Sequence, residues 1–145
     1  MNNGKERVKL SKVIQKMNLV NLTPQIDVSG IWLNLPDVNR PALQLTGFYD
    51  QFDNDRLQII VEHAYLASLS EQERYERYMQ LLSSNIPCII FCRSIKPEPK
   101  IIELAVKYQI PLLMTDQATS SFTAEVIRWL KVQLAPCIVI HGVLV

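Results

Sequence analysis

Hydrophobic positions follow different patterns before and after Leu57. Residues 8–19 have apolar side chains at helical spacing, and residues 20–36 have short alternating runs broken by proline and glycine, which predict a helix and then short strands. After Leu57, short apolar runs alternate with longer amphipathic segments. This order predicts an α/β domain with a mostly parallel sheet, right-handed crossover connections and helices on both faces of the sheet.

Four apolar runs have the length of strands, and they occupy residues 57–61, 86–91, 111–114 and 137–145. The run IPCIIF at 86–91 lacks polar alternation, which is typical of a strand that is covered on both faces. We therefore expect it at the centre of the sheet. The last run is expected to form one strand that continues to the final residue.

Three segments between these runs are predicted to be helices. Ser70 and Glu73 have the spacing of a capping box, in which each side chain accepts a hydrogen bond from the other residue's backbone N–H. A second helix is expected to begin at residues 97–99, because proline suits the first helical turn. A third covers residues 119–134 and is ended by Pro136.

The stretch from residue 39 to residue 61 has the densest local signals. Pro41 suits the first position of a short helix, and Gly47 suits its C-cap. Phe48 and Tyr49 follow, and we interpret them as packing against a neighbouring helix or subunit. The stretch therefore predicts a turn of helix, a polar loop and an entry into a strand.

Composition and charge narrow the class of protein. The chain has 145 residues, of which 48% are hydrophobic and 20% charged, and this is typical of one ordinary globular domain. A net charge of +1 without a basic block argues against a nucleic-acid partner. No apolar run approaches the roughly 20 residues that span a bilayer, so we expect no membrane partner. The three cysteines, without an apolar signal segment, predict reduced thiols and a cytoplasmic protein.

Motifs for phosphate and metal binding are missing from the sequence. None of its four glycines has the spacing of G-x-x-x-x-G-K-[ST] or G-x-G-x-x-G, so no phosphate loop is predicted. Cys88 and Cys92 lie on one predicted strand about 13 Å apart, too far to share a metal ion or a disulfide. The aspartates at positions 50, 53 and 55 lack the spacing of a calcium loop, and we interpret them as a solvated turn. No metal site is predicted.

His63 and His141 are the two histidines, and either could act as a general base. Neither has a neighbouring serine or cysteine in a nucleophile motif, so a structural role is the favoured interpretation. An enzyme that combines one of them with the aspartates is the least favoured hypothesis.

Several motifs resemble the N-terminal domain of bacterial HPr kinase/phosphorylase. The run RPALQLTGFYD at 40–50, followed by DRLQII at 55–60, is similar to that family's Arg-Pro-Gly-Leu-x-Leu-x-Gly-aromatic run and its Asp-Arg-hydrophobic-Gln motif. Residues 69–77, 86–93 and 140–145 also resemble the family, in the same order. Ala42 and Val61-Glu62-His63 depart from it, since the family usually has glycine there. The signature residues are Pro41, Gly47, Phe48, Tyr49, Asp55, Arg56 and Gln58.

The resemblance implies a fold similar to the uridine-nucleotide-binding domain of the Mur ligases over residues 1–135. It implies that residues 136–145 lead toward a catalytic P-loop domain, which would hold ATP and Mg²⁺ and would phosphorylate and dephosphorylate a serine of the phosphocarrier HPr. His141 matches the family's active-site histidine, in the context His-Gly-Val-Leu-Val.

From this resemblance we expect a non-catalytic regulatory or assembly domain of a carbon catabolite regulator. The chain is expected to need no cofactor of its own, because phosphoryl transfer requires a phosphate cradle and a metal. We expect it to form homo-oligomers, and we expect HPr to be bound through the catalytic domain.

A second hypothesis is a free-standing sensor of a phosphorylated metabolite or nucleotide. Ligands of open α/β sheets bind at the carboxyl ends of the strands. The residues that this hypothesis places there are Asn39, Arg40, Arg93 and Ser94.

Overall fold

The structure is a computed structural model, and it describes residues 7–36, 38–39, 57–60, 69–94, 96–135, 139–140 and 143–144. Several predictions of the sequence analysis lie outside these residues and stay predictions. They concern Arg40, Pro41, Gly47, Phe48, Tyr49, Asp50, Asp53, Asp55, Arg56, His63, Cys137 and His141.

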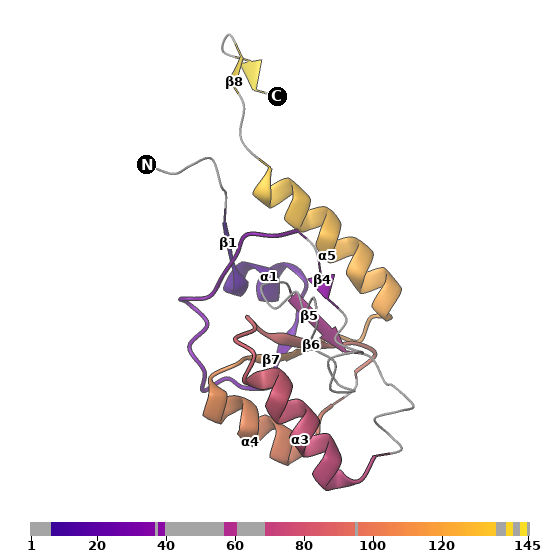
Figure 1. The fold of residues 1–145 in the computed structure, drawn as a ribbon. Coiled ribbons are helices and arrows are strands. Elements are labelled where there is room, and N and C mark those ends of the chain that lie inside the picture. The colour runs from indigo at the N-terminus through magenta and orange to yellow at the C-terminus, as the bar shows by residue number, and fades with distance from the viewer. Residues whose placement is uncertain are drawn as a thin grey trace.

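A five-stranded mixed sheet lies at the centre of the fold (Figure 1). Its strands, in spatial order, are β2 (Val20–Asn21), β7 (Leu112–Met114), β6 (Ile89–Phe91), β5 (Leu57–Ile60) and β4 (Val38–Asn39). β7, β6, β5 and β4 run parallel, and β2 pairs antiparallel with β7. The α/β class and the central place of β6 are confirmed. The antiparallel strand β2 was not predicted, and such an edge strand is common on an otherwise parallel sheet.

Alternate residues of β6 and its flanks enter two separate core clusters. Cys88, Ile90 and Cys92 belong to one cluster, and Ile89 and Phe91 belong to the other. All five are buried, as expected for a strand without polar alternation. Cys88 and Cys92 are not joined by a disulfide, as predicted.

The first cluster joins the strands to helices α1 (Leu10–Lys16) and α5 (Thr119–Leu134). In α5 the fully buried side chains are Phe122, Val126 and Leu130, spaced four residues apart so that they form one stripe. The predicted limits of this helix are confirmed.

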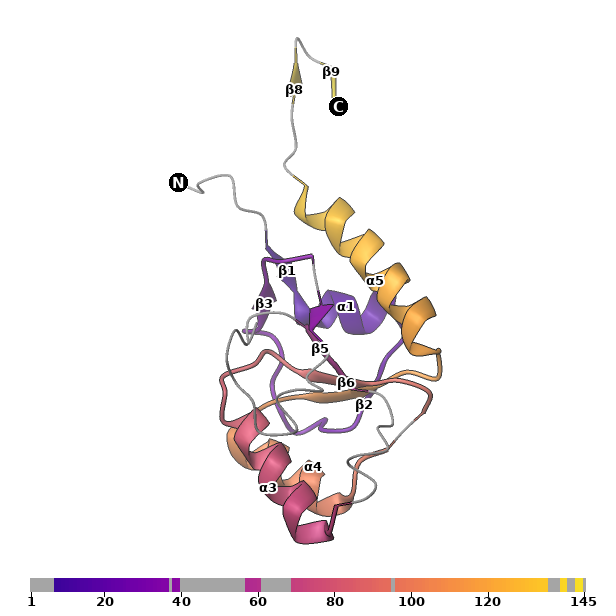
Figure 2. The ribbon, with the colours of Figure 1, turned by 45° about the vertical axis from the view of Figure 1, so that its right-hand side comes forward.

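The second cluster joins the strands to helices α3 (Glu71–Leu82) and α4 (Pro99–Tyr108), which lie side by side in Figures 1 and 2. The capping box before α3 is present. The Ser70 Oγ accepts from the Glu73 N–H at 3.2 Å, and the Glu73 carboxylate accepts from the Ser70 N–H at 3.2 Å. α4 begins at Pro99, as its prolines predicted.

Two small antiparallel pairs stand apart from the main sheet. β1 (Val8–Lys9) pairs with β3 (Trp32–Leu33), so the strands within residues 20–36 are shorter than the alternation suggested. β8 (Val139–Ile140) pairs with β9 (Val143–Leu144), whereas the sequence predicted one continuous strand. A His-Gly pair separates these two strands in the sequence, and glycine weakens the interior of a strand.

Candidate functional sites

The loop after β6 has an uncommon backbone conformation at the carboxyl edge of the sheet. Arg93 and Ser94 have φ angles of 58° and 54°, which non-glycine residues seldom adopt. The Arg93 N–H donates to the Gln117 carbonyl at 2.9 Å, and the Ser94 N–H donates to the Thr115 carbonyl at 2.8 Å. These two bonds hold the loop after β6 against the loop after β7. Both the Arg93 and the Ser94 side chains are exposed there.

Helix α5 begins at the same edge, directly after this second loop. Its N-cap, Ala118, provides no side-chain hydrogen bond, and its first turn has no acidic residue. The Thr119 Oγ1 is buried without a hydrogen-bond partner among the described residues. The free N–H groups and the positive end of the helix dipole therefore lie near the Arg93 loop.

The other described member of the predicted ligand set lies two strands away. Asn39 of β4 is in register with Gln58 of β5, and β5 separates β4 from β6. The described residues thus bring Arg93 and Ser94 together. A common site with Asn39 stays a prediction.

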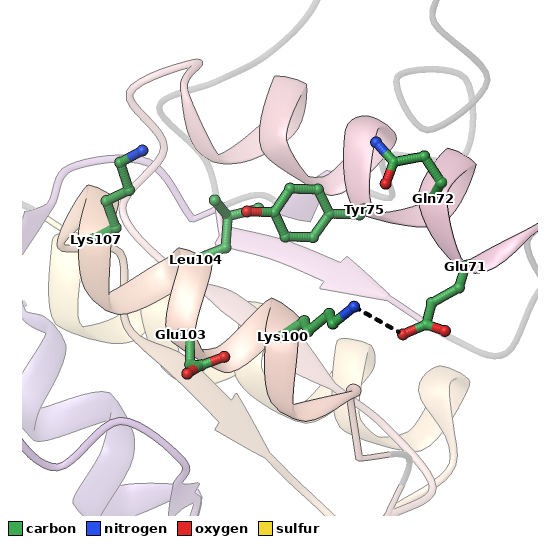
Figure 3. A pocket seen from close by; sticks show the side chains of 7 residues that line it. All are labelled: Glu71, Gln72, Tyr75, Lys100, Glu103, Leu104 and Lys107. Atoms are coloured by element: carbon green, nitrogen blue, oxygen red, sulfur yellow. Dashed lines mark ion pairs between the residues drawn. The ribbon is translucent and has the colours of Figure 1, made fainter.

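A surface groove separates α3 from α4 (Figure 3). Its volume is about 610 Å³, and Tyr75 reaches across it from α3 toward Leu104 of α4. The Lys100 Nζ lies 3.4 Å from the Glu71 carboxylate. The lining residues are Glu71, Gln72, Tyr75, Lys100, Glu103, Leu104 and Lys107. Positive and negative charges balance in this lining, which provides no arrangement for a specific chemical step.

A second hollow, of about 580 Å³, lies at the amino ends of β6 and β7, and we call it the amino-edge hollow. It is bordered by the loops before these two strands and by residues next to β1 and within β3. The lining residues are Arg7, Gly30, Ile31, Trp32, Asn34, Asn85, Ile86, Pro87, Tyr108, Gln109 and Ile110. It lies at the opposite end of the parallel strands from Arg93.

The amino-edge hollow is lined by an exposed tryptophan that has two cations near its ring, Arg7 in the lining and Lys9 beside it. Trp32 is 41% exposed, the Arg7 guanidinium lies 4.5 Å from its ring centroid, and the Lys9 Nζ lies 5.3 Å from it. This cluster was not predicted from the sequence. One local signal was available, because Trp32 occupies the polar side of the alternation that buries Leu33.

Burial makes two titratable groups of the core, Cys88 and Tyr78, unreactive. It raises the pKa of the Cys88 thiol to about 12 and that of the Tyr78 hydroxyl to about 12. A thiol that stays protonated is a poor nucleophile and a poor metal ligand. Within the described ranges, no group of three or more His, Cys, Asp or Glu side chains could hold a metal ion.

The described helices were compared with the length and composition of membrane-spanning helices. None of them combines the length and the apolar character that crossing a bilayer requires.

Comparisons with known proteins identify the family of the chain. The sequence matches the family described as HPr Serine kinase N terminus over residues 8–130. It is 54% identical over 140 residues to the HPr kinase/phosphorylase of Lachnoclostridium phytofermentans and 36% identical over 139 residues to that of Alkaliphilus metalliredigens. These alignments cover 95% and 94% of this chain and 45% of each relative.

A solved structure has a similar fold at low sequence identity. It is a crystal structure of the CBS and DRTGG domains of the regulatory region of Clostridium perfringens pyrophosphatase, complexed with the activator diadenosine tetraphosphate. The TM-score is 0.55 at 16% identity, with 88% of this chain and 47% of that one covered. This likeness shows the fold alone.

These matches define an α/β domain of a bacterial protein kinase family. The chain belongs to the HPr kinase/phosphorylase family and corresponds to its N-terminal domain. It spans about half the length of the curated relatives that it matches.

Proposed function

We propose that this chain is a non-catalytic regulatory or assembly domain of HPr kinase/phosphorylase, the enzyme that phosphorylates and dephosphorylates a serine of HPr. One observation carries the proposal. The chain matches the N terminus of that family over residues 8–130, while its sequence contains no phosphate-loop motif. Phosphoryl transfer depends on such a loop and on bound metal.

The same proposal includes the properties that the family resemblance implies. ATP and Mg²⁺ would be bound by a catalytic domain, HPr would be bound by that domain, and His141 would serve in its active site. A cytoplasmic location, homo-oligomers and a role in carbon catabolite regulation complete it. A Mur-ligase-like arrangement with helices on both sheet faces is also proposed, and the two core clusters support it.

A direct test compares three proteins in an assay with HPr, ATP and Mg²⁺. They are this chain, the whole Lachnoclostridium phytofermentans relative, and that relative without the segment that aligns with residues 8–130. We expect no phosphorylation by this chain. The shortened relative should keep phosphoryl transfer but change in oligomeric state or in its response to metabolites. Phosphorylation of HPr by this chain would refute the proposal.

A second candidate function is a sensor that binds a phosphorylated metabolite at the carboxyl edge of the sheet. It is favoured by the exposed Arg93 and Ser94, which the loop after β7 holds beside the start of α5. A thermal-shift screen with sugar phosphates tests it, since a ligand that binds the folded state raises the unfolding temperature. Stabilisation that is lost in Arg93→Gln would support this candidate, and no stabilisation by any compound would refute it.

A further inference from the structure

We propose that the amino-edge hollow binds a small organic anion that contains a flat unsaturated ring, and that a nucleoside monophosphate is a suitable probe of it. This inference does not rest on the regulatory role proposed above. It rests on four features of the hollow: its aromatic faces, its cations, its amides and its size.

The aromatic faces come from Trp32 and Tyr108. Trp32 is 41% exposed, although the next residue of the same strand, Leu33, is buried. Tyr108 ends α4 on another border of the hollow and is half-buried. Flat rings stack on such faces with little dependence on their exact substituents.

Arg7 is the cation in the lining, and Lys9 lies beside the hollow; both are exposed and both lie over the Trp32 ring. No carboxylate belongs to the lining, and neither cation forms an ion pair with another described residue. A guanidinium binds phosphate or carboxylate through two parallel hydrogen bonds. The Arg7 side of the hollow is therefore suited to the anionic group of the ligand.

Amide side chains lie on other borders of the hollow. The Asn34 and Asn85 side chains are exposed and have no hydrogen-bond partner among the described residues. The Gln109 Nε2 donates to the Val106 carbonyl at 2.7 Å. α4 also ends here, and the carboxyl end of a helix carries partial negative charge. The hydrogen-bond donors on the ligand's ring would face the carboxyl end of α4, and the ligand's anionic group would face Arg7.

The size of the hollow separates this ligand from a lone inorganic ion. Its volume of about 580 Å³ falls within the range of about 300–1,000 Å³ that small-molecule sites occupy. A single phosphate would leave most of that space unfilled. A net charge of +1 also makes the whole chain a poor partner for a nucleic-acid strand.

A fluorescence titration of the full chain tests the proposal. The chain has two tryptophans, so Trp129→Phe leaves Trp32 as the only indole. Three probes are then titrated separately. AMP carries both the ring and the anionic group, adenosine carries the ring alone, and ribose 5-phosphate carries the anionic group alone. We expect saturable quenching by AMP, with both partial compounds binding at least about tenfold more weakly.

Variants measured by calorimetry locate the bound probe. Trp32→Leu and Arg7→Gln should each weaken AMP binding by about tenfold. Gly30→Leu should also weaken it, because a Cβ at that lining position would have no atom within 4 Å and so has room to fill the hollow. The control Lys131→Gln, on α5 and outside the lining, should bind like the parent chain. Circular dichroism of each variant establishes that it is folded.

Several results of these measurements would overturn the proposal. They are no quenching at millimolar AMP, equal binding of either partial compound, tighter binding of a short single-stranded oligonucleotide, and unchanged binding in both Arg7→Gln and Gly30→Leu. Loss of binding in Arg93→Gln alone would assign the ligand to the opposite edge of the sheet and would also overturn it.

Discussion

The Arg74 Nε donates a hydrogen bond to the Glu98 carboxylate at 2.7 Å and so joins the first turn of α3 to the start of α4. The Arg74 Nη1 also donates to the Leu69 carbonyl at 2.6 Å. The hydrogen bond with Glu98 is the main reason why the pKa of the Arg74 guanidinium is raised. The pair links the starts of the two helices, and the groove of Figure 3 lies between these helices.

Removing the charge of Glu98 should lower the thermal stability only slightly, by an amount that depends on the salt concentration. We expect Glu98→Gln to lower the unfolding temperature by no more than about 4 °C, because partly exposed ion pairs contribute little to stability. High salt should remove most of the difference, since it screens the charges. Thermal unfolding at two salt concentrations measures this. Glu103→Gln is the matched control, and equal effects of both variants at low salt would contradict the prediction.

The capping box should stabilise α3 measurably. Ser70→Ala removes the acceptor for the Glu73 N–H, and we expect a loss of about 1 kcal/mol in the free energy of unfolding. Ser70→Gly should cost only about a few tenths of a kcal/mol, because glycine is itself tolerated at an N-cap. Urea unfolding monitored by circular dichroism separates the two. If Ser70→Ala and Ser70→Gly lowered the free energy of unfolding equally, loss of the N-cap would not explain the destabilisation.

Truncation in the central strand should be among the most damaging changes. Phe91 is 1% exposed, and its ring centroid lies 6.5 Å from that of Tyr78. Phe91→Ala should lower the free energy of unfolding by about 3–5 kcal/mol, because it removes a buried ring and leaves a cavity. Ile102→Ala, at a half-buried position of α4, is the control and should cost less. A cost at position 102 as large as that at position 91 would argue against the assigned core.

Alkaline pH should destabilise the fold through its buried thiol. Burial raises the pKa of Cys88 from its ordinary value of 9.0 to about 12, so the folded state retains a proton that the unfolded chain loses. The resulting stabilisation is complete below the unfolded pKa and is lost as the pH rises through the folded one. Burial also raises the pKa of Tyr78 from 10.0 to about 12, and this group changes the stability in the same direction.

Urea midpoints between neutral pH and about pH 11 test this linkage. Stability should fall above about pH 9, and the fall should be shallower in Cys88→Ala, which has one titrating group fewer. A pH profile of the variant that runs parallel to that of the parent chain would exclude Cys88 as the source.

Local patterns predicted most of the helices and the central strand. The four-residue spacing of Phe122, Val126 and Leu130 and the S-x-x-E pair at Ser70 each depend on residues within one or two helical turns. The apolar run that forms β6 predicted burial on both sides by its composition alone. The antiparallel pairing of β2 was not predictable in this way, because it depends on which distant strand edge was left open.

The candidate sites also differ in how far local sequence predicts them. Arg93 and Ser94 were predicted from their position after β6, but their N–H groups donate to carbonyl groups of the distant loop after β7, which no local pattern indicates. The amino-edge hollow was missed entirely. Its members Arg7, Trp32, Asn85 and Tyr108 are separated by long stretches of chain and meet only through folding.

The sequence by itself determined the α/β class, the limits of α5, the capping of α3 and the resemblance to the HPr kinase/phosphorylase family. These depend on short-range periodicity, on local hydrogen bonding and on motif order, all of which can be read from the order of residues in the sequence. The tertiary structure alone decided the mixed sheet, the arrangement at its carboxyl edge and the cluster around Trp32. Each of these is a contact between distant segments, and such contacts follow from the packing of the whole core rather than from any local pattern.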